Sequence, residues 1–132
     1  MVGIVKVDTL QNNAGTSSVD MDYVVNGSAK AWYNLNGTGT IASRDDFNIA
    51  SYTDNGTGDY TSTFTSAMNN ANYSVFVGVS VRSGTDANSM PSHYTGTPAT
   101  TTTYRLHNRE ISAVRTNRDA EYFTVGFHGD LA

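Results

Sequence analysis

The chain contains no cysteine, so disulfide bonds, thiol nucleophiles and thiolate metal ligands are all excluded. Residues that favour helices are scarce: there are four leucines, two glutamates, two lysines and one glutamine. This shortage argues against a helical bundle or a coiled coil. No apolar run approaches the roughly 18–20 residues of a membrane span, so we expect no membrane partner.

Basic residues are also few, with eight lysines and arginines against twelve acidic residues and a net charge of −4. This balance argues against a nucleic-acid partner. The apolar opening is too short for a secretory signal peptide, which predicts synthesis in a cytoplasm without export. Without disulfides, a chain of 132 residues must be stabilised by its core or by partner chains.

What the chain does contain is 18 threonines, 13 serines, 13 asparagines and 12 glycines. Its β-branched residues number 34, as 18 threonines, 12 valines and 4 isoleucines. This composition predicts an all-β protein with a polar surface. Short strands at regular spacing, separated by turn signals, favour a single antiparallel β-sandwich of jelly-roll-like type. We place the sandwich at residues 29–132, after an N-terminal strand and extended segment at residues 1–28.

Alternation of apolar and polar residues predicts the individual strands. Residues 2–7 read as a short strand, and residues 8–22 as a surface loop or an arm that packs on a neighbouring chain. Asn-Gly-Thr-Gly occurs at 36–39 and at 55–58, which predicts a meander over 30–65 with type I′ turns and a positive φ at Gly56. Residues 73–81 read as a central strand with buried valines, and 82–98 as the longest loop. Further strands are expected at 100–106, 111–116 and 121–128.

The sequence offers no catalytic, cofactor-binding or metal-ligating residues. The three histidines, His93, His107 and His128, lack neighbours at ligand spacing. Residues 54–59 resemble a calcium loop but carry glycine at two ligand positions, so a hairpin turn explains them better. Asp45 and Asp46 are adjacent and would face opposite sides of a strand, which rules out a shared acid–base site there. We therefore predict a non-enzymatic protein with no cofactor.

Contact surfaces are the remaining candidates. Trp32 and Phe76 lie on strand faces opposite the predicted core, where they form a second core, an interface or, for Trp32, a sugar-stacking platform. Four arginines fall within 14 positions among acidic residues, which indicates salt-bridged strand ends or a contact with an acidic neighbour. The interface candidates are thus Trp32, Phe76, Arg105, Arg109, Arg115 and Arg118. Uncovered apolar groups and a small core predict a symmetric homo-oligomer, with Trp32 or Phe76 and part of residues 8–22 in or beside the interface.

Several stretches resemble a module found in structural proteins of tailed bacteriophages, notably phages of cyanobacteria and other aquatic bacteria. They are Lys-Ala-Trp-Tyr-Asn-Leu-Asn-Gly-Thr-Gly at 30–39, Arg-Asp-Asp-Phe-Asn-Ile-Ala-Ser at 44–51, and Thr-Asp-Asn-Gly-Thr-Gly-Asp-Tyr at 53–60. The opening at 5–12 and the ending at 123–129 are similar to the first and last segments of such proteins.

This resemblance implies a non-enzymatic protein of the virion surface, made in the bacterial host. From this resemblance we expect it to act as a capsid decoration (cement) protein or a short fibre component. Its implied partners are other virion proteins, such as the major capsid protein or tail and neck components, and copies of itself. Phage surface proteins of this kind are commonly threefold, so the resemblance implies a homotrimer. The alternative is an adhesin, as at a receptor-binding fibre tip, that binds a host surface glycan through the loop at 82–98 and Trp32.

Overall fold

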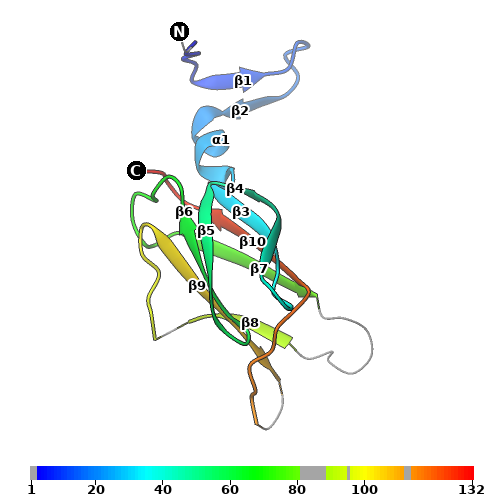
Figure 1. Ribbon diagram of the computed structural model, residues 1–132. Helices are drawn as coiled ribbons and strands as arrows, with labels where there is room; N and C mark the ends of the chain where they lie inside the picture. Colours follow the sequence, from blue (N-terminus) through cyan, green and yellow to red (C-terminus); the bar gives the residue numbers. More distant parts are fainter. Residues whose placement is uncertain (1–2, 81–88, 95, 112–113) are drawn as a thin grey trace.

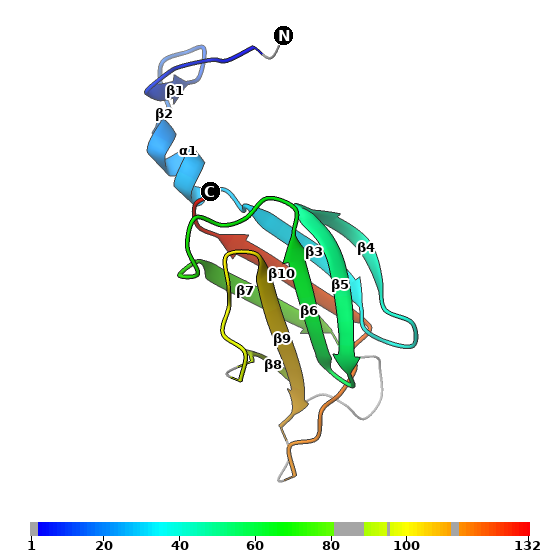
Figure 2. The same cartoon turned by 60° about the vertical axis from the view of Figure 1, so that its left-hand side comes forward.

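Strands make up most of the computed structural model, which describes residues 3–80, 89–94, 96–111 and 114–132 (Figures 1 and 2). The elements in chain order are β1 (Thr9–Gln11), β2 (Ser18–Asp20), α1 (Met21–Gly27), β3 (Ala31–Asn36), β4 (Ala42–Phe47), β5 (Ile49–Gly56), β6 (Asp59–Phe64), β7 (Ser74–Ser80), β8 (Ser89–His93), β9 (Thr103–Glu110) and β10 (Tyr122–His128). The predicted all-β class is confirmed.

Two four-stranded sheets pack against each other to form the sandwich. The first sheet has the order β4-β3-β10-β7, and the second has the order β5-β6-β9-β8. Every neighbouring pair in both sheets is antiparallel. The antiparallel β-sandwich is therefore confirmed, while the jelly-roll assignment stays a prediction.

The core lies between the sheets and consists largely of aromatic rings. Phe127 on β10 is fully buried, and its ring lies within 5.0–6.0 Å of four other rings. These rings belong to Tyr33, Phe64, Tyr73 and Tyr104. Three of the contacts are edge-to-face, an arrangement that aromatic pairs favour. Aromatic side chains from both sheets thus contact the single ring of Phe127 on β10.

Strand β7 faces the core as predicted, but it lies at the edge of the first sheet. Val75, Val77 and Val79 face inward, half-buried, and pack against the core. The prediction of a central position for this strand is wrong. The central strands are β3 and β10, whose inward residues are almost completely buried. One apolar face is common to central and edge strands of a sandwich, so alternation does not distinguish them. Val81 lies outside the described residues.

Both Asn-Gly-Thr-Gly segments join antiparallel strands, β3 to β4 and β5 to β6, so the predicted hairpins are confirmed. The prediction of one meander over residues 30–65 is wrong, because β4 belongs to the first sheet and β5 to the second. Gly56 has a φ of +123°, as predicted. The type I′ assignment is wrong, because Gly56 pairs with Asp59 and the turn residues are Thr57 and Gly58. Only Gly58 of these two has a positive φ, at +65°, whereas a type I′ turn requires two.

Three other expectations about local structure need correction. Residues 3–7 form no strand, and the first strand begins at Thr9. The predicted loop at 82–98 contains strand β8 in its described part, and the predicted strand at 111–116 is not a strand at its described positions. Tertiary pairing explains the last two differences. Segment 89–93 is a strand because it pairs along β9, whereas the described residues of 111–116 pair with no strand, and an isolated bridge joins Arg109 to Asn117.

Candidate interaction surfaces

The N-terminal segment, defined here as residues 3–27, projects from one end of the sandwich (Figures 1 and 2). Its two parts are the β1–β2 hairpin and helix α1, where the sequence predicted a loop or arm. Asp20 caps the helix: its side chain accepts a hydrogen bond from the Asp22 amide at 3.0 Å. In the sequence, the signal for this helix was Asp20, an N-capping residue type directly before Met-Asp-Tyr-Val-Val.

The N-terminal segment has no core of its own. Residues 3–20 are all exposed, and helix α1 has no buried residue. Large apolar side chains in the segment are exposed by 39–84%: Ile4, Val5, Val7, Leu10, Val19, Tyr23 and Val25. A helix of seven residues is too short to be stable alone in water. The segment therefore leaves its large apolar side chains uncovered by the described residues of the sandwich.

A second apolar surface runs across the outer face of the first sheet. Phe47 pairs with Trp32, Trp32 with Gly126, and Gly126 with Phe76, so these four residues form one row across all four strands. We call them the aromatic row. Trp32 and Phe76 stand on either side of the glycine in a shallow groove of about 590 Å³, and both are exposed. Their predicted position opposite the core is confirmed, although an interface role stays a prediction.

Gly126 forms the floor of this groove, and no neighbouring atom of the protein requires a glycine at this position. A Cβ built on Gly126 would meet no atom within 4 Å, and its φ is not positive. Glycine inside a strand weakens it and can mark a place where a ligand or another backbone approaches closely. The aromatic row is therefore accessible down to the backbone of β10.

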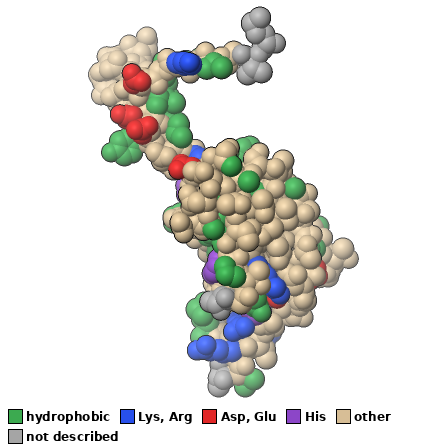
Figure 3. All heavy atoms as spheres, turned by 90° about the vertical axis from the view of Figure 1, so that its left-hand side faces the viewer, with side chains coloured by type: hydrophobic (Ala, Val, Ile, Leu, Met, Phe, Trp, Pro, Cys, Tyr) green, Lys and Arg blue, Asp and Glu red, His purple; other side chains and the backbone are tan. Residues whose placement is uncertain are grey.

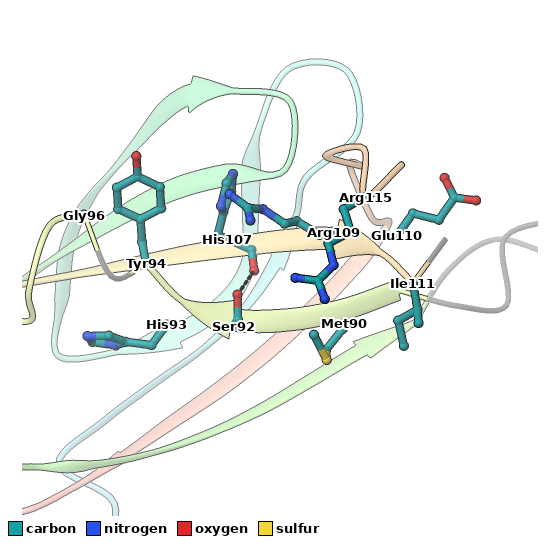
Figure 4. Close-up of a pocket in the computed structure, with 10 residues that line it drawn as sticks. All are labelled: Met90, Ser92, His93, Tyr94, Gly96, His107, Arg109, Glu110, Ile111 and Arg115. Carbon is teal, nitrogen blue, oxygen red and sulfur yellow. Dashed lines mark hydrogen bonds between the residues drawn. The ribbon is translucent and has the colours of Figure 1, made fainter. Parts of the chain in front are cut away.

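A cleft of about 540 Å³ lies along β8 and β9 of the second sheet (Figure 4). We call it the arginine cleft; its lining residues are Met90, Ser92, His93, Tyr94, Gly96, His107, Arg109, Glu110, Ile111 and Arg115. Strand pairing opposes Ser92 to His107 and Met90 to Arg109. Because Leu106 and Asn108 are buried in the core, the alternate residues His107 and Arg109 lie on the outer face of β9.

His107 is the most enclosed side chain of the cleft, with 5% exposure. Its ring meets the Tyr94 ring at 5.0 Å, and the Arg105 guanidinium stacks on that tyrosine at 4.2 Å. Burial lowers the pKa of His107, and the positive charge of Arg109 lowers it further, so the ring is neutral at neutral pH. The buried Nε2 atom has no hydrogen-bond partner among the described residues.

The four clustered arginines divide into two kinds. Arg105 makes a bidentate ion pair with Asp59, both N···O distances being 2.7 Å, and Arg118 pairs with Glu110 at 2.9 Å. Arg109 and Arg115 make no ion pair with any residue that the structure describes. The prediction of salt-bridged strand ends thus holds for one pair of arginines. In Figure 3, most of the blue surface lies at the end of the molecule opposite the N-terminal segment.

The structure separates two features that the glycan-binding alternative had combined. Trp32 lies on the first sheet, whereas the described part of residues 82–98 includes β8, the edge of the second sheet. Sequence reasoning also missed His107 as a lining residue, because only the β8–β9 pairing places it beside Ser92 and Tyr94. The alternation of residues along 103–110 was the one sequence signal that His107 lies on the same outer face of β9 as Arg109.

The described ranges of the chain lack two other types of feature. They contain no group of three or more histidine, aspartate or glutamate side chains arranged to hold a metal ion. No helix there has both the length and the apolar character needed to cross a membrane.

Comparisons with known proteins give no further guide to this chain. No protein-family model, no curated protein and no solved structure matches it.

Proposed function

We propose that this chain is a non-enzymatic structural protein of a bacteriophage virion surface, a capsid decoration protein or a short fibre component. It assembles as a homotrimer through its N-terminal segment. The sequence resemblance described above supports the virion assignment. One structural observation supports the assembly: residues 3–27 project from the sandwich with their large apolar side chains exposed.

The apolar area in this segment favours self-association over a solitary chain. Val5 is 84% exposed, Tyr23 77% and Val25 51%. Burying a side chain of this size contributes on the order of 1.5–3 kcal/mol, and a closed symmetric assembly repeats that gain in every copy. The aromatic row, with Trp32 and Phe76, provides a second face for the same assembly or for another virion protein.

Two carboxylates beside the clustered arginines are held in ion pairs, which suits a binding surface better than general-base catalysis. The carboxylate of Glu110 accepts hydrogen bonds from Thr116 and Arg118, and that of Asp59 is held by Arg105. Carboxylates held in this way are poor general bases, because their partners stabilise the charged form.

Light scattering on the purified chain tests the assembly. We expect a trimer of about three times 14.2 kDa, and we expect the double substitution Val5→Ser and Val25→Ser to shift it toward monomer. Val114→Ser is the matched control, because Val114 is 80% exposed but lies outside the N-terminal segment. Phe76→Ser asks separately whether the aromatic row contributes. A wild-type protein that stays monomeric at micromolar concentration would overturn the proposed assembly.

A test of the virion assignment needs the particle itself. Antibody raised against the chain should label intact phage particles in electron micrographs, on the capsid for a decoration protein and on the tail for a fibre component. Labelling confined to infected-cell debris would contradict the assignment.

A further inference from the structure

The arginine cleft has two positive charges without an ion-pair partner among the described residues. Arg109 and Arg115 both line it, and neither makes an ion pair with the described residues. In Figure 4 their side chains extend near His107 and Ser92. Guanidinium groups bind oxyanions such as carboxylate and sulfate through paired hydrogen bonds. The cleft therefore presents donors for an anionic group on a chain whose net charge is −4.

The cleft also presents apolar and polar contacts next to these charges. Met90 and Ile111 are 52% and 58% exposed, and Tyr94 lines the cleft toward its other end (Figure 4). The buried Nε2 of His107 has no hydrogen-bond partner among the described residues. Buried polar atoms are normally paired, so an unpaired one in a cleft lining is a position where a ligand can supply the partner.

We propose that the arginine cleft binds an acidic saccharide, a sugar that carries a carboxylate or a sulfate group. The oxyanion pairs with Arg109 and Arg115, the apolar face of the sugar ring lies on Met90 and Ile111, and a sugar hydroxyl reaches His107. A volume of about 540 Å³ lies within the usual range for small-ligand sites. This proposal does not depend on the virion assignment or on the oligomeric state.

Two other anionic partners fit the cleft less well. An extended nucleic acid would meet Glu110 in the lining and a net negative protein field. A peptide added as a strand would pair with the edge strand β8, but Pro91 in the middle of β8 has no N–H to donate. A single sugar unit avoids both obstacles.

The backbone at Arg115 gives independent support for a binding role. Its φ is +44°, a left-handed conformation that costs a non-glycine residue on the order of 1–3 kcal/mol. Such conformations cluster at ligand-binding sites, where an optimal side-chain position outweighs backbone strain. An arginine at this position, where glycine would be unstrained, is consistent with selection for its guanidinium group.

Isothermal titration of the full chain with defined oligosaccharides tests the proposal. The probes are a uronate oligosaccharide, a sulfated oligosaccharide and a neutral oligosaccharide of the same length. Sodium sulfate and a single-stranded oligonucleotide serve as non-saccharide anions. We expect one or both acidic sugars to bind, with an affinity that falls as salt screens the ion pairs. We expect the neutral sugar to bind at least about tenfold more weakly, since it lacks the charge-assisted contacts.

Variants locate the binding site. The double substitution Arg109→Gln and Arg115→Gln should weaken acidic-sugar binding by about a hundredfold, roughly tenfold for each arginine. Arg44→Gln is the control; it removes a positive charge from β4 on the other sheet and should leave binding unchanged. Amide chemical-shift changes on wild-type protein, centred on β8 and β9, would give the same location should the double variant fold poorly.

Several outcomes would overturn the proposal. They are binding of the neutral sugar as tight as that of the acidic sugars, equal binding of sulfate ion or oligonucleotide, and equal loss in Arg44→Gln. Absence of binding to either acidic sugar would also overturn it. None of these results bears on the light-scattering test of assembly, so the two proposals fail separately.

Discussion

Asn48 is the single residue between β4 and β5, so the chain passes from the first sheet to the second at this position. Its φ is +60°, a conformation that asparagine tolerates better than most residues. Its Nδ2 donates to the carbonyls of Lys30 and Ser66 at 3.0 and 3.1 Å, and its Oδ1 accepts from the Ser66 amide at 2.7 Å. One side chain thus ties three segments together at the corner of the sandwich.

Two substitutions at Asn48 separate its backbone role from its side-chain role. Asn48→Gly keeps the left-handed backbone but loses the three hydrogen bonds, at a cost of about 1–3 kcal/mol. Asn48→Ala loses the bonds and adds backbone strain, which costs roughly 1–2 kcal/mol more. Urea denaturation should therefore rank the proteins as wild type, glycine variant, alanine variant. An alanine variant as stable as the glycine variant would show that the backbone conformation carries no strain.

The ion pair between Asp59 and Arg105 makes the stability of the fold depend on pH, in a direction that follows from the pKa of Asp59. The hydrogen bonds from Arg105 lower the pKa of Asp59 below its ordinary value. The folded protein therefore binds this proton less tightly than the unfolded chain does. The stabilisation is present above the ordinary aspartate pKa of about 3.9 and is lost as pH falls through the lowered folded value.

The test at this position is a comparison of melting temperatures between wild type and Asp59→Asn from pH 7 down to pH 2. Asparagine keeps the size of the side chain but cannot titrate. We expect wild type to be more stable near neutral pH and the difference to shrink below about pH 4. A difference that stays constant across this range would contradict an origin in the charge of Asp59.

At the scale of elements, the β5–β6 hairpin is fixed by the contact of its turn with the β9–β10 connection. The Gly58 amide donates to Asp119 Oδ1 at 2.7 Å, and the Asn108 amide donates to the Gly58 carbonyl at 2.7 Å. A Cβ built on Gly58 would lie 2.6 Å from the carbonyl oxygens of both Asn108 and Arg118. This turn therefore requires glycine for space as well as for its positive φ.

Alanine substitutions at two glycines distinguish these requirements. Gly39 has nearly the same φ as Gly58, +66° against +65°, but a Cβ there would meet nothing within 4 Å. Gly39→Ala should cost only the backbone strain, roughly 1–2 kcal/mol. Gly58→Ala should cost a further 1–3 kcal/mol or so, because the turn must move away from β9. Equal denaturation midpoints for the two variants would contradict the close packing of this turn.

Elements were predictable from the sequence where local pattern and tertiary position agree. Strands β3, β6 and β10 have clean alternation, and their inward residues form the core. Strand β8 contains Pro91 and lacks alternation, and it is a strand only because β9 offers it a partner. The arginine cleft was not predictable for the same reason: its residues come together through that pairing and through the later segment that contains Arg115.

At the scale of the whole molecule, the two proposed contact regions lie at opposite ends. The N-terminal segment projects from one end of the sandwich, and the arginines gather near the other (Figures 1 and 3). The C-terminus lies near the N-terminal segment in both ribbon views. An assembly through residues 3–27 would therefore leave the arginine cleft of every copy facing outward.

Hydrogen exchange measured at several protein concentrations tests whether residues 3–27 make the assembly contact while the sandwich is stable without it. A seven-residue helix and an isolated two-stranded hairpin are marginal in water, so amides of β1, β2 and α1 should exchange rapidly in the dilute monomer. Assembly buries this segment, so its amides should gain protection as concentration rises. Amides of β3 and β10, central in the first sheet, should exchange slowly throughout.

The double substitution Val5→Ser and Val25→Ser supplies the control, since both side chains belong to the exposed apolar set of the N-terminal segment. This variant should lose the concentration-dependent protection of residues 3–27 and keep the slow exchange of β3 and β10. If the segment were instead strongly protected at every concentration, it would be stable within a single chain. If it stayed unprotected at every concentration, another molecule would be the partner. Either result would exclude self-association through this segment as the basis of the assembly.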